Sequence, residues 1–563
     1  MFSTSIIAKI IKETSQNLFL YPGGTIAPLL YECNQIGVNL IVTKHEQGAG
    51  YMAIAEAALY NRPSFVAVTS GPGITNLITV IADAYYDSIP LIILSGQVST
   101  NDLARCSTIR QRGFQEVPTI DLVKNITKSV FQPKNVDELL DAVHQAIQIS
   151  NSGRKGPVVI DMPMNVQLTQ INEEILSSIP EIYHKEDSCE YPKYKASKIQ
   201  KIIEHITHSK KPLFLIGAGA QGEWKAVREF VKKSNIPAVS SLRGIGVLNQ
   251  KLTCGWIGHT GLPWANAILH EADTVIVLGS RLDIRQTGSQ TEILDHKKII
   301  HVDIDIEELN NCRIKNTIKL HMPIQEFIEK LDFSINIQSI SPWLSQIQTL
   351  KESMKLEDFI DNNATGLCPK EVLDLVNTFL KNKNSVVTTG VGAHQHWVAR
   401  YIDFDNAKCK LFTSAGHGTM GYGLPVALGL QYLNKEVLTL CIDGDGSFQM
   451  NLQELALIKA MNLKVKILIM DNNRLGIVSQ FQNITFQDDP TTGNVSNPDF
   501  ANIASAYGIK SFYMETLETS IIQEWLGSDE ASLLHVKIKH DTPLSPMLLG
   551  GQELNSMWYF HAK

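Results

Sequence analysis

A single aspartate stands between two glycines in the segment Gly444-Asp445-Gly446, which follows an apolar run. Glycines let the backbone turn sharply and let a ligand approach closely. Asn472 follows the next apolar run, at a spacing that suits two parallel strands joined by one helix, so both side chains would emerge at the same sheet edge. Their oxygens, beside a glycine-rich turn, suit Mg²⁺ and a diphosphate. The alternative is an ordinary turn in which Asp445 only caps a helix.

Length and composition narrow the class of protein. The 563 residues suffice for about three domains. The net charge of −7, without a Lys/Arg block, predicts no nucleic-acid partner. The eight cysteines are scattered without a C-x-x-C pair, which favours a reducing cytoplasm over a zinc or disulfide framework. The N-terminus has the spacing of an amphipathic helix rather than an export signal, and no apolar run is long enough to span a membrane. We therefore expect a cytoplasmic protein that binds no membrane.

Short apolar runs alternate with helical patterns along the chain, which predicts parallel α/β units. Two polar stretches, 184–198 and 336–365, are expected to be linkers. They divide the chain into three α/β domains with parallel sheets, at 1–180, 195–335 and 360–563. The apolar runs that support this fold class are Phe65–Thr69, Leu91–Leu94, Val158–Ile160, Leu213–Ile216, Thr274–Leu278, Ile299–Ile304 and Val465–Met470.

The middle part contains a G-x-G-x-x-G segment, Gly217–Gly222, after an apolar run. A dinucleotide site of this type requires an acidic residue at the end of the next strand. Here that strand ends Val239-Ser240-Ser241. We therefore expect close helix–strand packing, or a nucleotide bound in another pose, rather than a nicotinamide site.

The motif GDGS…DNN resembles that of the thiamine-diphosphate enzymes, in which GDG is followed by N or NN. Over nearly the whole chain, the sequence is similar to the catalytic large subunits of the acetolactate (acetohydroxyacid) synthase family. The matching segments are YPGGT (21–25), KHEQGAG (44–50), TSGPGITNLIT-IADAYYDSIPLI-LSGQV (69–98), FQEV (114–117), SGRKGPVVIDMP-NVQ (152–167), HVDIDIEEL (301–309), VGAHQHW (391–397), SAGHGTMGYGLPVALG (414–429) and GDGSF.

The resemblance implies three thiamine-diphosphate enzyme domains (pyrimidine-binding, central and diphosphate-binding) and a set of cofactor residues. Mg²⁺ would be held by Asp445, Asn472 and the backbone carbonyl of Arg474. For His394, a capping or packing role is the alternative. The residues that the resemblance places around thiamine diphosphate are Gly24, Pro72, Asn76, Gly392, His394, Gly418, Met420, Gly444, Gly446, Ser447 and Ile477.

Three residues would carry the chemistry of the cofactor. Glu46 would hydrogen-bond the pyrimidine ring and so promote loss of the thiazolium proton; alternatively, it is only an acidic residue at a helix start. The Gly418 carbonyl would accept a hydrogen bond from the 4′-amino group. Met420 would hold the cofactor in its bent shape; alternatively, it is a core methionine. Gln115 and Phe481 are expected near the substrate.

The resemblance also implies a second cofactor and an assembly. FAD would lie in the central domain, against Gly217, Arg281, Arg285 and Asp303, although Gly258–Leu262 does not reproduce the M-H-G-T of the family. In the family, the glutamate and the GDG turn of one site come from different subunits. We therefore expect a homodimer or homotetramer, with a small regulatory subunit as a further partner.

The implied reaction is a decarboxylating carboligation of a 2-oxo acid: two pyruvate molecules give 2-acetolactate and CO₂, a step of branched-chain amino acid biosynthesis. Two departures from the family pattern bear on the choice of the second substrate, the acceptor. Phe481 replaces a Trp, and Arg110 and Arg112 precede the FQEV segment. Guanidinium groups beside the cleft would favour an anionic or hydroxylated acceptor, such as a keto-sugar nucleotide. They are alternatively solvated loop charges. A cofactor-binding scaffold without turnover is the third hypothesis.

Overall fold

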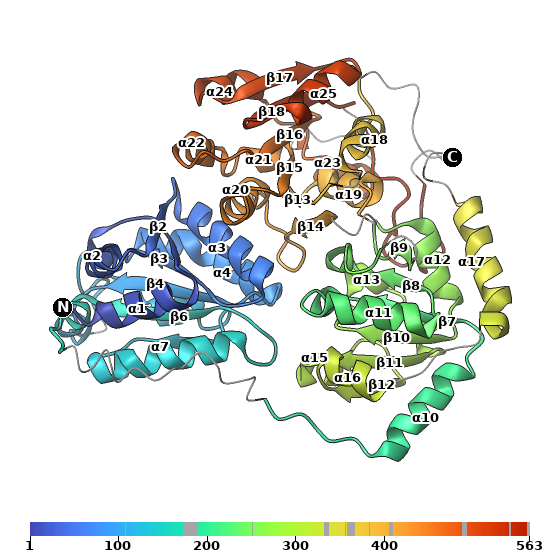
Figure 1. The fold of residues 1–563 in the computed structure, drawn as a ribbon, viewed down its shortest axis with the longest axis horizontal. Helices are drawn as coiled ribbons and strands as arrows, with labels where there is room; N and C mark the ends of the chain where they lie inside the picture. The colour runs from blue at the N-terminus through green and yellow to red at the C-terminus, as the bar shows by residue number, and fades with distance from the viewer. Residues whose placement is uncertain are drawn as a thin grey trace.

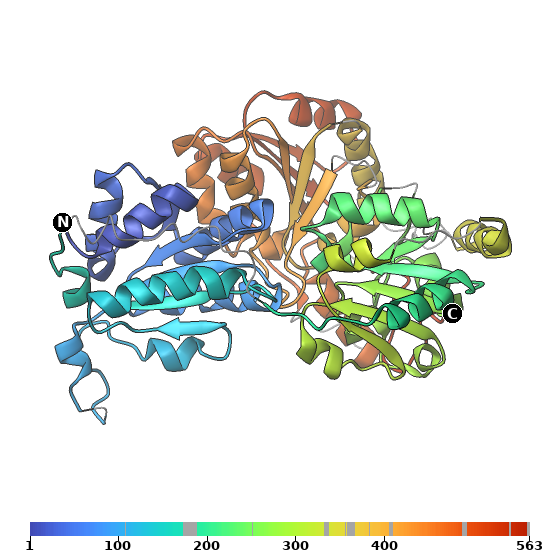
Figure 2. The same cartoon turned by 60° about the horizontal axis from the view of Figure 1, so that its bottom comes forward.

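Three parallel α/β units make up the chain (Figure 1, Figure 2). The computed structural model describes residues 1–563 except 107, 173–188, 250–251, 332–336, 355, 357–365, 382, 405–408, 487–492, 540–541 and 560–563. Each unit contains a six-stranded sheet whose strands pair in parallel, with helices on its faces. The predicted fold class is therefore confirmed.

The N-terminal sheet has the strand order β2-β1-β3-β4-β6-β5. Strands β3 and β4 are buried along their whole length because helices cover both faces, which explains their continuous apolar sequences. The elements of this unit are α1 (Thr4–Thr14), β1 (Asn17–Leu20), η1 (Gly24–Ile26), α2 (Ala27–Gln35), β2 (Asn39–Val42), α3 (Glu46–Tyr60), β3 (Ser64–Val68), α4 (Pro72–Tyr86), β4 (Leu91–Gln97), α5 (Thr100–Leu103), α6 (Thr119–Val123), β5 (Ser129–Phe131), α7 (Val136–Asn151), β6 (Val158–Pro163) and α8 (Met164–Gln167).

The predicted amphipathic helix at the N-terminus is α1, whose isoleucines are buried in the core of the N-terminal unit. Helix α1 is thus part of the folded unit. Across the described ranges, every helix is too short or too polar to cross a membrane.

The central sheet has the order β12-β11-β10-β7-β8-β9. Its elements are α10 (Ala196–Thr207), β7 (Pro212–Ile216), η3 (Ala218–Ala220), α11 (Trp224–Ser234), β8 (Ala238–Ser240), η4 (Leu242–Gly244), β9 (Thr253–Trp256), α12 (Pro263–Glu271), β10 (Thr274–Leu278), α13 (Ile284–Thr287), α14 (Glu292–Asp295), β11 (Lys298–Asp303), α15 (Ile306–Asn310), β12 (Thr317–His321), α16 (Ile324–Lys330), η5 (Ile337–Ile340) and α17 (Ser341–Ser353).

One of the two stretches expected to be linkers, 336–365, contains a helix that packs on the central unit. Most of the second one that is described folds into α17, which packs on the central unit through the buried Trp343. The Trp343 indole donates a hydrogen bond to the Pro212 carbonyl at 3.0 Å. Residues 184–188 and 357–365 of these stretches lie outside the described residues.

The C-terminal sheet has the order β14-β13-β15-β16-β18-β17. Its elements are α18 (Pro369–Leu380), β13 (Ser385–Thr389), α19 (Ala393–Tyr401), β14 (Cys409–Thr413), α20 (Gly423–Leu433), β15 (Leu438–Gly444), α21 (Asp445–Phe448), η7 (Leu452–Glu454), α22 (Leu455–Ala460), β16 (Lys466–Asp471), α23 (Gly476–Phe486), α24 (Phe500–Ala506), β17 (Lys510–Met514), α25 (Thr519–Gly527) and β18 (Ser532–Lys537).

The N- and C-terminal units share one apolar core, in which α3 packs against α20 (Figure 1). The helices approach closely at Gly429: a Cβ there would lie 3.0 Å from the Cα of Met52. The glycine therefore permits this contact, which fixes the unit that carries Glu46 against the unit that carries Asp445.

The G-x-G-x-x-G segment of the central unit packs on the turn that follows β10. A Cβ on Gly217 would lie 2.0 Å from the backbone oxygen of Gly279. We therefore expect Gly217→Ala to shift the urea unfolding midpoint downwards, by an amount corresponding to about 1–3 kcal/mol, because backbone must move. Gly527→Ala is the matched control, since nothing lies within 4 Å of a Cβ there. Equal midpoints for the two variants would contradict the close packing.

Candidate active site

Asp445 lies at the carboxyl edge of the C-terminal sheet, where β15 and β16 pair with Gly444 opposite Met470. It is the first residue of α21, whose N-cap position is occupied by Gly444. Asp445 therefore lies in the first turn of the helix and not at its N-cap position. Its Oδ2 accepts a hydrogen bond of 2.6 Å from the side-chain amide of Asn497.

The pKa values of the neighbouring carboxylates Asp445 and Asp471 are shifted in opposite directions. Burial raises the pKa of Asp445 to about 7, and repulsion from Asp471 adds to this shift. The pKa of Asp471 lies below its usual range: burial alone would raise it, but hydrogen bonds from His535 at 2.8 Å and Lys537 at 2.5 Å outweigh burial. The Lys537 ammonium thus pairs with Asp471, while the Asp445 carboxylate accepts a hydrogen bond from the uncharged amide of Asn497.

Asn472 follows β16 and is buried next to this aspartate pair. Its Oδ1 accepts a hydrogen bond of 3.2 Å from the backbone N–H of Arg474. The described residues contain no group of three or more His, Cys, Asp or Glu side chains suited to a metal. A carboxylate with amide and carbonyl oxygens is instead a hard-oxygen donor set, which fits Mg²⁺ better than a transition metal.

His394 is buried beneath the Gly-Asp-Gly turn. Its Nε2 lies 3.0 Å from Oδ1 of Asp443, and a Cβ on Gly444 would lie 2.5 Å from its Nδ1. The ring therefore packs under the turn, as one of the two interpretations of this histidine expects. Near it, the Ser447 hydroxyl accepts a hydrogen bond of 3.0 Å from the Gly421 N–H.

Met420 reaches over the same turn. A Cβ on Gly446 would lie 3.3 Å from the terminal carbon of Met420 and 2.7 Å from a methyl of Leu475. A side chain at Gly446 would thus fill the space between these two residues. Gly418, two residues before Met420, is exposed with φ of 78°, and nothing lies within 4 Å of a Cβ there. The turn and this loop leave room for a bound group, as the thiamine-diphosphate expectation requires.

The N-terminal residues gather at the carboxyl ends of β1, β2 and β3. Glu46 begins α3 and is buried; its Oε2 accepts a hydrogen bond of 3.1 Å from the side-chain amide of Asn76. Gln115 lies against the turn before α4, where a Cβ on Gly71 would be 3.0 Å from its carbonyl oxygen. Two further predicted residues are at this edge, Gly24 at the start of η1 and Pro72 at the start of α4.

Within one chain, the residues around Glu46 contact the C-terminal unit: the Lys44 N–H donates to the Glu454 carboxylate at 3.1 Å, and the Asn451 amide donates to Gln47 at 3.5 Å. Among the described residues, no hydrogen bond or ion pair joins Glu46 itself to Asp445. The expectation that they meet across a dimer concerns two chains and stays a prediction.

A cavity of about 1110 Å³ lies where the three units meet. Its volume exceeds that of most small-molecule sites. Arg281, Arg285 and Asp303, predicted for FAD, line the cavity. Gly217 lies behind its wall, and the neighbouring Ala218 and Gly219 line it. Gly418, Ile477 and Phe481 line the same cavity, so it also reaches residues expected around the cofactor and substrate.

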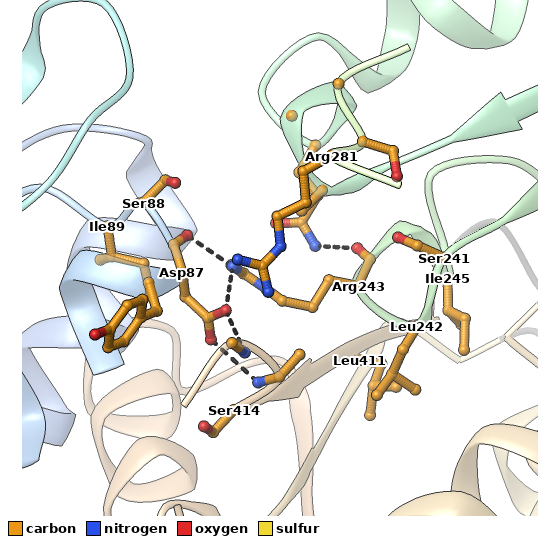
Figure 3. A pocket seen from close by; sticks show the side chains of 18 of the residues that line it. Asp87, Ser88, Ile89, Ser241, Leu242, Arg243, Ile245, Arg281, Leu411 and Ser414 are labelled. Carbon is orange, nitrogen blue, oxygen red and sulfur yellow. Dashed lines mark hydrogen bonds and ion pairs between the residues drawn. The ribbon is translucent and has the colours of Figure 1, made fainter. Parts of the chain in front are cut away.

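Asp87 joins the three units at one wall of this cavity (Figure 3). Its carboxylate accepts hydrogen bonds from the backbone N–H groups of Ala415 at 3.2 Å and Gly416 at 2.9 Å. The Arg243 guanidinium of the central unit lies 3.1 Å from the same carboxylate and donates to the Asp87 carbonyl at 2.7 Å. The sequence analysis missed these two residues because an acid at a helix end and a lone arginine form no motif.

The two arginines expected to select the acceptor lie in the loop before Glu116. Arg112 forms an ion pair of 2.7 Å with Glu116 and donates to the Leu103 carbonyl. Arg110 is exposed. Arg112 is therefore engaged within its own loop.

Each of the three units matches a known domain family. Residues 2–123 match the N-terminal TPP binding domain of thiamine pyrophosphate enzymes, 199–331 the central domain and 390–536 the C-terminal TPP binding domain. The fold and the site therefore define a thiamine pyrophosphate enzyme.

Individual relatives narrow this class. The chain is 34% identical to the mitochondrial acetolactate synthase of Schizosaccharomyces pombe, over 97% of this chain and 84% of that protein. It is 32% identical to the acetolactate synthase large subunit of Lactococcus lactis, over 99% of this chain and 96% of that protein. It is 33% identical to the isozyme 2 large subunit of Escherichia coli, over 96% of both chains. The chain belongs to the acetolactate synthase family of thiamine pyrophosphate enzymes.

The position of Asp445 makes a prediction for cofactor binding. We expect Asp445→Asn to weaken binding of thiamine diphosphate in the presence of Mg²⁺ by at least about tenfold in titration calorimetry, because a charged oxygen ligand is lost. The matched control is Asp121→Asn, since Asp121 is an exposed carboxylate paired with Lys124. Unchanged affinity of the Asp445→Asn protein would contradict a metal site at this turn.

Proposed function

We propose that this chain is the catalytic subunit of an acetolactate synthase that uses thiamine diphosphate and Mg²⁺. In the reaction, two pyruvate ions and one proton give one 2-acetolactate ion and one CO₂. The C–C bond between the keto carbon and the carboxylate of one pyruvate breaks. That keto carbon then forms a new C–C bond with the keto carbon of the second pyruvate.

The observation that carries this proposal is the geometry at the carboxyl edge of the C-terminal sheet. Asp445 and Asn472 follow two strands that pair directly, and both side chains are buried. Met420 faces Gly446 across a space that any larger residue would fill. Similarity over nearly the full length of acetolactate synthases supports the same conclusion.

Thiamine diphosphate, when bound, supplies a carbon acid whose anion attacks the keto carbon of pyruvate and stabilises the charge left by CO₂. Oxygens of Asp445 and Asn472 and the Arg474 carbonyl would hold the Mg²⁺ that binds its diphosphate. Gly392, Gly444 and Ser447 would lie along the phosphates, and Ile477 along the rings.

Glu46 would act at the far end of the cofactor. Its carboxyl would share a proton with the pyrimidine ring nitrogen, while the Gly418 carbonyl would accept a hydrogen bond from the amino group. Asn76, 3.1 Å from Glu46, keeps that carboxyl oriented. Because the family resemblance implies that the glutamate and the Gly-Asp-Gly turn of one site come from different subunits, we infer a homodimer in which each site takes Glu46 from one subunit and Asp445 from the other.

The cavity between the units would hold FAD. Its volume of about 1110 Å³ and the residues Arg281, Arg285 and Asp303 in its wall fit a group of dinucleotide size that carries phosphates. The reaction is redox-neutral overall, so the flavin would be structural. Two relatives are named large subunits, which supports a small subunit as an additional partner.

Pyruvate is the acceptor that the site supports best. The case for a keto-sugar nucleotide relied on two free guanidinium groups near the cleft, and Arg112 is instead paired with Glu116. Phe481 is 61% exposed and lines the cavity together with Ile477, so this part of the wall offers apolar side chains. Such a wall suits the methyl group of pyruvate.

The proposed reaction is tested by product analysis. Purified protein with pyruvate, thiamine diphosphate, Mg²⁺ and FAD is expected to release CO₂ and form 2-acetolactate, as measured by mass spectrometry. Glu46→Gln should lower the rate of CO₂ release by about 10²–10⁴-fold, because the amide cannot share its proton in the same way. Glu13→Gln, which changes an exposed glutamate of α1, should leave the rate unchanged. No acetolactate from pyruvate alone would refute the proposal.

Flavin binding is tested separately. We expect protein purified with added FAD to retain the dinucleotide after gel filtration and to release it on denaturation, as detected by flavin fluorescence. Gly219→Trp should reduce retention, because a Cβ at this position would lie 2.9 Å from the Cα of Gly279, so a large side chain must displace this part of the cavity wall. Gly527→Trp, at an open surface position, is the control. Absence of flavin from the unsubstituted protein would show that the cavity serves another purpose.

A further inference from the structure

The loop that carries Gly418 is held by the hydroxyl of Ser414. This Oγ accepts hydrogen bonds from the backbone N–H groups of Gly418 at 3.0 Å and Thr419 at 3.1 Å. It donates to Oδ1 of Asp83 at 2.5 Å. Since Asp83 lies on α4, an N-terminal side chain determines where this C-terminal loop is placed.

The hydrogen bonds continue from Asp83 to α3. The Tyr51 hydroxyl donates to Oδ2 of Asp83 at 2.8 Å. Tyr51 belongs to the helix that begins at Glu46. Tyr51, Asp83 and Ser414 are each at most 1% exposed, so water does not compete for these bonds. Buried hydrogen bonds to a carboxylate are among the stronger ones in proteins.

A second contact, one turn further along the chain, reinforces the first. Asp87 follows α4 and accepts hydrogen bonds from the next two backbone N–H groups of the loop, those of Ala415 and Gly416 (Figure 3). Arg243 fixes Asp87 from the central unit. The loop is therefore attached to α4 at consecutive residues.

We propose that Tyr51, Asp83 and Ser414 are positioning residues that set the Gly418 loop relative to the helix beginning at Glu46. The inference rests on the proposed function, in which both Gly418 and Glu46 contact thiamine diphosphate. In the proposed dimer, Glu46 and Gly418 of one chain serve different sites, so this hydrogen-bonded chain links the two sites through one subunit. A change at either end displaces groups at the other.

The first test is amide hydrogen exchange, which requires no activity. We expect Ser414→Ala, Asp83→Asn and Tyr51→Phe each to speed exchange at residues 418–419 by about tenfold, because each removes part of the support of the loop. Tyr51→Phe is the decisive variant, since it keeps the ring and lies on another helix. Unchanged exchange at 418–419 in Tyr51→Phe would overturn the linkage to α3.

The second test separates positioning from stability. Ser64 is also fully buried and donates to a buried carboxylate, that of Glu56, at 2.7 Å. Ser64→Ala therefore matches Ser414→Ala in the bond it loses. We expect Ser414→Ala to lower kcat for acetolactate formation by about tenfold, with little change in the KM for pyruvate. Ser64→Ala should leave kcat unchanged, and Ser414→Thr should restore part of the loss.

The outcomes distinguish the two proposals. An equal fall in kcat for both serine variants indicates a general loss of stability and overturns the positioning role. If the unsubstituted protein forms no product from pyruvate, the proposed function fails. The exchange measurement then still decides whether the three residues hold the loop.

Discussion

The candidate site depends on one geometric constraint: every strand of each sheet runs in the same direction. A parallel sheet delivers the turns that follow all its strands to one edge. In the N-terminal sheet, Leu20 pairs with both Val42 and Ala67, so the turns containing Gly24, Glu46 and Pro72 converge. In the C-terminal sheet, the register between β15 and β16 does the same for Asp445 and Asn472. Residues far apart in the sequence thereby form two compact surfaces.

Much of this arrangement could be predicted from the sequence because it is local. Apolar runs such as Thr274–Leu278 became strands, since helices on both faces make a buried parallel strand continuously apolar. Helix α17 was missed because its apolar residues, Trp343 and Ile347 among them, are separated by many polar ones, and only one face packs on the central unit. Its polarity resembled that of a linker.

Contacts between units could not be predicted in the same way. Asp83 and Asp87 are four residues apart, a spacing typical of solvated acids on a helix surface. Asp87 accepts from backbone N–H groups of another unit, and a backbone partner cannot be recognised in the sequence. The cavity likewise could not be predicted from the sequence, because its wall is formed by residues of all three units, Arg243 among them. Side-chain chemistry therefore identified the ends of the site but not what holds them together.

The contact between Asp87 and the loop has a consequence for which substitutions evolution can accept. Because Asp87 accepts hydrogen bonds from backbone N–H groups, the exposed Ala415 can be replaced by other residues without loss of this hydrogen bond. Position 416 has no such freedom: a Cβ there would lie 2.8 Å from the Cβ of Tyr86. Among relatives, substitutions should therefore be more frequent at position 415 than at position 416.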